Sequence, residues 1–104
     1  MMKLCKSLCV YTALILIAEP IFANPSLGER YPGPWKEDFN VDITKALVTK
    51  GIKGCGEYKY RPSSLNRDEY LVHCTHDGKR WSAYLVWPKI KEIMGPYAPD
   101  PSVE

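Results

Sequence analysis

The sequence predicts an α+β domain in which one N-terminal helix packs on a three-stranded antiparallel meander with one disulfide. Three observations predict this class. Apolar residues recur at helical spacing over roughly residues 41–50, and two alternating apolar stretches flank an Asp-Gly pair at 77–78. Two cysteines, Cys55 and Cys74, remain after a predicted export signal. We therefore expect a small, exported and covalently stapled domain.

The first 23 residues have the composition of a secretory signal peptide. Lys3 and Lys6 precede an apolar run over residues 8–18, and Ala23 stands where cleavage is expected. The run is shorter than the roughly 20 residues that cross a bilayer, which argues against a permanent membrane anchor. We expect the chain to be exported, either to the periplasm or out of the cell.

Proline and glycine mark the organisation of the remaining chain. Residues 24–38 form a predicted Pro/Gly-rich arm, residues 39–95 a small α+β domain, and residues 96–104 a flexible tail. The arm carries Tyr31 and Trp35, large side chains of the kind that dock on a core. The hydrophobic core of a domain this small seldom contributes more than about 3–5 kcal/mol to the free energy of unfolding. We therefore expect a disulfide to add to its stability.

The helix is predicted over roughly residues 41–50. Its stripe consists of Phe39, Ile43, Ala46, Leu47 and Lys50, which recur at spacings of four, three, one and three residues. Asn40 or Asp42 is placed to cap its first turn, and Gly51 is placed to end it. A helix this short is unstable alone in water, so we expect a sheet to hold it.

Three strands are predicted at roughly residues 54–60, 68–76 and 79–87. A two-residue turn at Asp77-Gly78 would place Cys74 opposite Trp81, and a disulfide directly across the first pair of strands would place Cys55 opposite Cys74. One face then carries Cys55, Tyr70, Val72, Cys74, Trp81, Ala83 and Leu85. The other carries Tyr58, Tyr60, Leu71, His73, Ser82, Tyr84 and Val86. We assign the helix to the cysteine face, which is the more aliphatic one, although Glu57 and Lys59 fit that face poorly.

Cys55 and Cys74 are predicted to form an intramolecular disulfide. Disulfides form and persist in oxidising compartments, where an exported chain would fold. The bond would close a loop of about 20 residues, for which chain entropy predicts roughly 3 kcal/mol of stabilisation. This stabilisation is comparable with the contribution that the hydrophobic core makes.

Three stretches carry a resemblance to a known family. They are "DITKALVTKGIKG" for the helix and its exit, "EYLVHCTHDGKRWSAYLVWP" for the hairpin, and "KIKEIMG" for the closing segment. Over roughly residues 40–95 their order resembles the PepSY and related beta-lactamase-inhibitor-like domains of exported bacterial proteins. The resemblance implies a non-enzymatic exported module that binds another protein or restrains a hydrolase.

With the helix on the cysteine face, the opposite face becomes a patch rich in tyrosine. We expect it to bind a protein or peptide partner through Tyr58, Tyr60, Tyr84, Trp87 and His73. The alternative is that the arm and the tail cover this patch as the second half of the core. The nearly neutral charge of residues 24–104 argues against a nucleic-acid partner.

Two other functions are weighed against protein binding. His73, Cys74 and His76 are zinc-ligand types, which makes a metal-binding envelope protein one alternative. Their spacing argues against it, because on a strand His73 points to the opposite side from the other two. A small secreted hydrolase is the second alternative, but a disulfide removes the thiol that a cysteine nucleophile needs. We therefore predict no enzyme activity, no metal and no cofactor, and the sequence indicates no oligomeric state.

Overall fold

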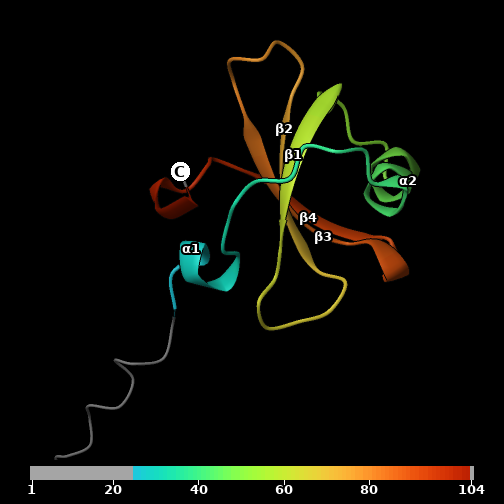
Figure 1. The fold of residues 1–104 in the computed structure, drawn as a ribbon. Helices are drawn as coiled ribbons and strands as arrows, with labels where there is room; N and C mark the ends of the chain where they lie inside the picture. Colours follow the sequence, from blue (N-terminus) through green and yellow to red (C-terminus); the bar gives the residue numbers. More distant parts are fainter. Residues whose placement is uncertain (1–24, 104) are drawn as a thin grey trace, which may run out of the picture.

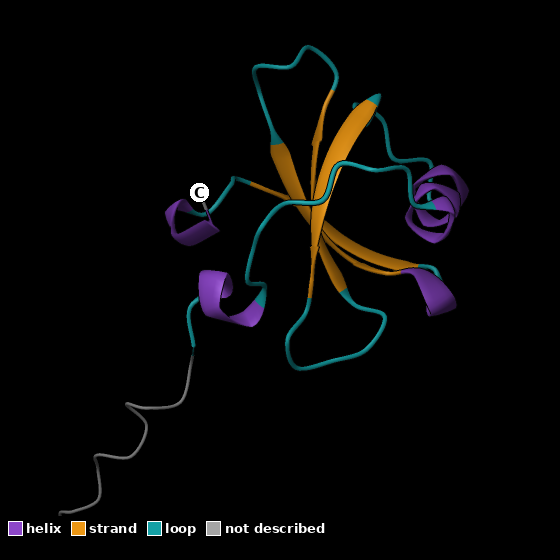
Figure 2. Cartoon of the chain, viewed as in Figure 1, coloured by secondary structure: helices purple, strands orange, loops and turns teal. Residues whose placement is uncertain are grey.

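The computed structural model describes residues 25–103, so the predicted signal peptide lies outside the described residues. The elements follow in the order α1 (Leu27–Arg30), α2 (Val41–Thr49), β1 (Glu57–Pro62), β2 (Tyr70–Thr75), β3 (Ser82–Trp87), η4 (Pro88–Ile90), β4 (Glu92–Tyr97) and η5 (Pro101–Val103). Within this part of the chain the strands form one antiparallel sheet in the order β1-β2-β3-β4. Helix α2 lies on one side of the sheet, and α1 and η5 lie on the other (Figures 1 and 2).

The α+β class is confirmed, and so is the helix predicted at 41–50. The side chain of Asn40 caps α2 by accepting a hydrogen bond from Ile43 N at 3.0 Å, and Gly51 follows the helix with a φ of 67°. The expectation of three strands is wrong, because β4 adds a fourth. This edge strand exposes most of its side chains, so it lacks the apolar alternation that marks a strand in a sequence.

The register predicted for both hairpins is also wrong. Tyr84 rather than Ala83 lies opposite Val72, a shift of one residue, and Tyr58 rather than Cys55 lies opposite Cys74, a shift of three. Because side chains alternate along a strand, each odd shift exchanges the two faces. The tyrosines of β1 and β3 therefore share a face with Val72 and Cys74 of β2. Ala83, predicted on the cysteine face, lies instead with Leu71 on the opposite face.

Asp77 explains the shift between β2 and β3. Its Oδ1 accepts hydrogen bonds from the backbone N–H groups of Lys79 at 2.8 Å and Arg80 at 2.9 Å. Thr75 Oγ1 accepts another from Gly78 N at 2.9 Å. These bonds organise a loop longer than the expected two-residue turn.

The Cys55–Cys74 disulfide is confirmed, with 4.6 Å between the two Cα atoms. Cys55 precedes β1 instead of lying within a strand opposite Cys74. The bond therefore fastens the segment between α2 and β1 to the C-terminal end of β2.

The face under α2 forms the larger of the two apolar clusters. Its buried members are Ile43, Ala46, Leu47, Tyr60, Val72, Cys74, Tyr84 and Val86. Two tyrosine hydroxyls also hold the entry to α2. Tyr58 Oη donates to Asn40 O and accepts from Asn40 N, both at 3.0 Å, and Tyr60 Oη donates to Asp38 at 3.0 Å.

The opposite face of the sheet is covered by the two ends of the described chain. Tyr31, Leu71, Ala83 and Val103 are buried there. The backbone N–H of Gly28 in α1 donates to Ser102 Oγ in η5 at 3.0 Å, and the two short helices lie side by side (Figure 1). Val103 of η5 is thus buried against this face, within the segment predicted as a tail.

A buried carboxylate ties the arm to the sheet. The hydroxyl of Tyr31 donates to Glu69 Oε2, and Asn66 Nδ2 donates to Glu69 Oε1 at 2.8 Å. Burial raises the pKa of Glu69, but hydrogen bonds from Tyr31, Asn66 and Trp87 outweigh it, so the net pKa is lowered. Glu69 is therefore a charged anchor for the arm.

Candidate functional site

The residues predicted to bind a partner do not form one surface. Tyr60 and Tyr84 are 4% and 6% exposed and lie in the core under α2, and Tyr58 is half-buried beside them. His73 is 5% exposed and lies on the other side of the sheet, in β2, where the helix does not reach. Trp87 is half-buried at the end of β3, where it hydrogen-bonds Glu69. A partner would have to displace α2 to contact the buried side chains of Tyr60 and Tyr84.

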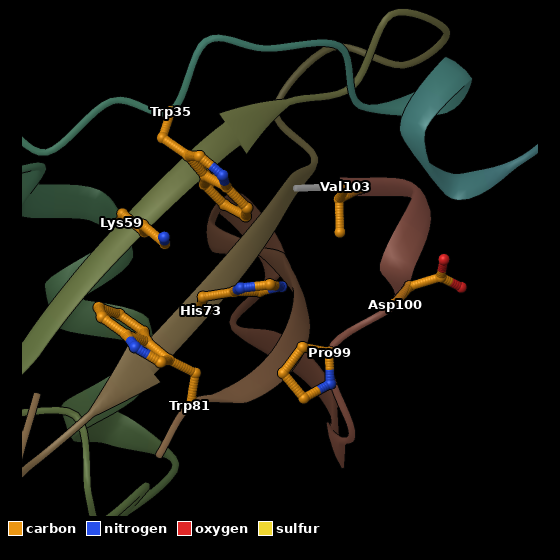
Figure 3. A pocket seen from close by; sticks show the side chains of 7 residues that line it. All are labelled: Trp35, Lys59, His73, Trp81, Pro99, Asp100 and Val103. Atoms are coloured by element: carbon orange, nitrogen blue, oxygen red, sulfur yellow. The ribbon is translucent and has the colours of Figure 1, made fainter. Parts of the chain in front are cut away.

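A cavity of about 190 Å³ lies on the face opposite α2. It is lined by Trp35, Lys59, His73, Trp81, Pro99, Asp100 and Val103 (Figure 3). These residues come from the arm, β1, β2, the loop before β3 and the C-terminal segment. Convergence of several separate segments on one concave site is typical of ligand-binding positions. We call this feature the tryptophan–lysine cavity.

The ammonium group of Lys59 lies between two indole rings. Its Nζ is 4.8 Å from the ring centroid of Trp35 and 4.6 Å from that of Trp81, and Figure 3 shows it between them. The guanidinium of Arg61 also contacts Trp35, with its Cζ 4.3 Å from the ring centroid. Lys59 and Arg61 alternate with the core tyrosines along β1, so both project away from α2. Cations at this distance from an indole are held by its ring quadrupole.

Backbone pairing positions Trp35 over the sheet. The next residue, Lys36, exchanges two hydrogen bonds with Tyr60 along the outer edge of β1, at 2.8 and 2.9 Å. Through this bridge, Lys36 of the arm pairs with the edge of the sheet beside β1. The indole of Trp35 is thereby held against His73, with 4.5 Å between the ring centroids.

His73 forms the floor of the cavity. Its ring points toward Pro99 and Val103 (Figure 3), and its Nε2 is buried without a hydrogen-bond partner among the described residues. Burial, together with the charges of Lys59 and Arg61, lowers the pKa of His73 to about 4. The imidazole is therefore neutral near pH 7.

A second cavity, of about 160 Å³, adjoins the first. Lys59 and Trp81 line both, and Glu37, Glu57 and Tyr58 complete the second. Trp81 is half-buried, so part of its ring faces solvent. Lys59 and Trp81 thus form the rim between two adjoining hollows, the second of which reaches Tyr58.

Sequence reasoning missed this site although one signal pointed to it. Glu57 and Lys59 fit the face assigned to the helix poorly, and that misfit came from the wrong register of β1. With the observed register both residues face away from α2. Trp35 gave no such signal, because it lies in a segment with no predicted pairing.

The structure also places the three candidate zinc ligands. Cys74 is in the disulfide, His73 points to the opposite face of β2, and His76 is exposed in the loop after it. Over residues 25–103 no three His, Cys, Asp or Glu side chains are grouped so that they could hold a metal ion. In the same range no helix is long and apolar enough to cross a membrane.

Comparison of the chain with protein-family models, with curated proteins and with solved structures gives no match. The PepSY-like resemblance therefore stays a prediction. The site has to be interpreted from its own geometry.

Proposed function

We propose that the chain is an exported, non-catalytic module that binds a protein or peptide partner through the rim of the tryptophan–lysine cavity. The rim consists of Trp35, Lys59 and Trp81. One observation carries the proposal: a lysine ammonium lies between two tryptophan rings beside a cavity, on the face that α2 leaves uncovered. Binding of this kind is also how such a module would restrain a hydrolase.

The residue types of the rim support this proposal. Tryptophan buries a large area at modest cost in side-chain entropy and is enriched where binding energy concentrates. The rim residues are already held in place, Lys59 by its strand and Trp35 by the bridge between Lys36 and Tyr60. A preorganised surface loses less conformational freedom when a partner binds.

The compartment that we propose for the protein follows from its disulfide. A disulfide between Cys55 and Cys74 is compatible with an oxidising compartment, and the signal-like residues 1–23 favour export. The periplasm or the outside of the cell is where we place the partner.

Site-directed photo-crosslinking tests the proposal. A photoreactive residue is placed at Glu37 or Glu57, both exposed beside the rim, and in matched variants at Lys45 or Val48, both exposed on α2. We expect one exported protein to crosslink from the first pair and not from the second. The purified partner should then bind wild-type protein and lose binding when Trp81→Ala is introduced.

Two results would contradict the proposal. Crosslinking of the same protein from the α2 positions would move the surface to the other side of the molecule. Unchanged affinity of the purified partner for the Trp81→Ala protein, with an unchanged thermal midpoint, would remove the rim from the interface.

A further inference from the structure

Within the described part of the chain, Lys59 of the tryptophan–lysine cavity has no carboxylate within ion-pair distance. Over residues 25–103 the one ion pair joins Lys89 to Asp68. Glu37 and Glu57 line the adjoining cavity, beyond that distance. The aromatic walls hold the cation in place but do not neutralise it.

Asp100 lines the cavity but does not serve as the missing anion. Its Oδ1 accepts a hydrogen bond from Ser102 N at 2.8 Å, and Figure 3 shows its carboxylate pointing away from Lys59. The hydrogen bonds from the Ser102 backbone and side chain lower the pKa of Asp100, so it stays charged while bound to η5. Its role in the structure is to cap the C-terminal segment.

A buried polar atom is the second observation that points to a ligand. The Nε2 atom of His73 has no hydrogen-bond partner among the described residues, although the side chain is 95% buried and its ring lines the cavity. A buried nitrogen without a partner is costly, and such groups in proteins usually meet a bound molecule or water. The cavity volume of about 190 Å³ is far above the roughly 10–15 Å³ that one water needs.

We infer that the tryptophan–lysine cavity binds the carboxylate side chain of a glutamate or aspartate on the partner protein. The carboxylate accepts a charge-assisted hydrogen bond from Lys59 Nζ, and the methylene groups of the bound side chain contact the indoles of Trp35 and Trp81. The guanidinium of Arg61 lies on the far side of this site, against the Trp35 ring, and the inference does not depend on its charge. This inference rests on the proposed function, because it names the partner group that the rim recognises.

Charge complementarity favours a carboxylate over a neutral group. A glutamine or a sugar could stack on the indoles but would leave the charge of Lys59 unmatched. Glutamate has both parts that the site offers contacts for, an aliphatic stem and an anionic head. Inorganic phosphate shares the charge but lacks the stem, so it should bind more weakly.

The test uses the purified disulfide-bonded protein and three probes. They are acetyl-Glu-Glu-Glu-amide, acetyl-Gln-Gln-Gln-amide and inorganic phosphate, titrated while the tryptophan indole N–H signals are followed by NMR. We expect the Glu peptide to shift the signals of Trp35 and Trp81 and not that of Trp87, which serves as an internal control at the other end of β3. The Gln peptide and phosphate should bind at least fivefold more weakly.

Variants at one position sharpen the result. Lys59→Gln should weaken binding of the Glu peptide about tenfold, as expected for loss of one charge-assisted hydrogen bond, while Lys59→Arg retains it. Lys79→Gln, in the exposed loop before β3, is the matched control and should bind as wild type does. Equal binding of the Glu and Gln peptides, equal binding of phosphate, or no effect of Lys59→Gln would overturn the inference.

Failure of this inference and failure of the proposed function give different results. If a partner crosslinks beside the rim but binding of the Glu peptide is independent of Lys59, the proposed binding surface is supported. The inference that it recognises a carboxylate is then wrong. If the Glu peptide binds through Lys59 but the partner crosslinks only from α2, the cavity binds carboxylates and the proposed interface is wrong.

Discussion

The two faces of the sheet are closed in different ways. A nine-residue helix covers one face and packs its apolar stripe onto tyrosine, valine and cysteine side chains. The other face is covered by the two ends of the described chain, whose short helices meet through the contact between Gly28 and Ser102. A regular helix fills the space above a sheet evenly, whereas two short segments leave gaps. The tryptophan–lysine cavity and an apolar cavity of about 240 Å³ both lie on this second face.

The difference in covering also separates stability from recognition. Side chains under α2 bury apolar area, so changes there should act mainly on folding. Side chains on the second face include cations, tryptophans and a buried histidine, so changes there should act on binding and on the pH dependence of stability. Four predictions probe how the two faces are held, from the largest expected effect to the smallest.

The first prediction concerns the core under α2. Replacing Tyr58 and Tyr84 together by alanine should lower the free energy of unfolding by about 3–5 kcal/mol, because Tyr84 is buried and Tyr58 holds the entry to the helix. Urea denaturation followed by circular dichroism measures the loss. Tyr97→Ala, at a position 46% exposed, is the control and should cost far less. Equal losses would mean that α2 does not close this face.

The second prediction concerns the disulfide between Cys55 and Cys74. Replacing Cys55 and Cys74 by alanine should cost about 2–4 kcal/mol, because the bond restricts the unfolded chain and fastens the segment after α2 to β2. Hydrogen exchange should show the loss of protection concentrated in α2 and β1. Loss of protection confined to α1 and η5 would contradict the assignment of the disulfide to the helix-covered face.

The third prediction uses the pKa of His73, which the fold lowers from 6.5 to about 4. Between these values the unfolded chain binds a proton that the folded chain does not, so stability falls as the pH decreases from 6.5 to 4. The change should amount to about 1–3 kcal/mol and should disappear in His73→Gln. His76→Gln, in the exposed loop, should keep the wild-type profile, and a pH profile unaltered in His73→Gln would show that another group causes it.

The fourth prediction probes the contact between the chain ends. A Cβ atom at Gly28 would collide with the backbone carbonyl of Ser102, so Gly28→Ala should cost about 1–3 kcal/mol through overpacking. Gly56→Ala is the matched control, because an added Cβ there meets no atom within 4 Å. Thermal unfolding distinguishes the two. Equal midpoints would mean that η5 can move away from α1 at little cost.

Some of this architecture could be predicted because its causes are local. Helix α2 follows from its own apolar spacing and from the Asn40 cap, both within a few residues. The pairing of Cys55 with Cys74 follows from there being two cysteines beyond the signal-like segment. The positions of β1, β2 and β3 follow from alternation, with ends that differ from the predicted ones by at most three residues.

The candidate site could not be predicted, because it depends on register and on distant segments. Asp77 organises a longer loop than a two-residue turn, and that single extra residue decides that Tyr84 rather than Ala83 lies on the face with Val72. Trp35 reaches the site through a backbone bridge on β1, and Val103 through an apolar anchor at the other end of the chain. No periodicity within either segment records these contacts.

The sequence alone determined the fold class, the helix and the disulfide of this protein, because each follows from residues close in the chain or from a unique pair of cysteines. Only the tertiary structure decided which sheet face the helix covers, and it alone placed Lys59 between Trp35 and Trp81. The physical reason is the two-residue period of a strand. Shifts of one and three positions leave β1, β2 and β3 close to their predicted places. They nevertheless move the tyrosines of these strands onto the face under α2 and Lys59 onto the face that carries the candidate site.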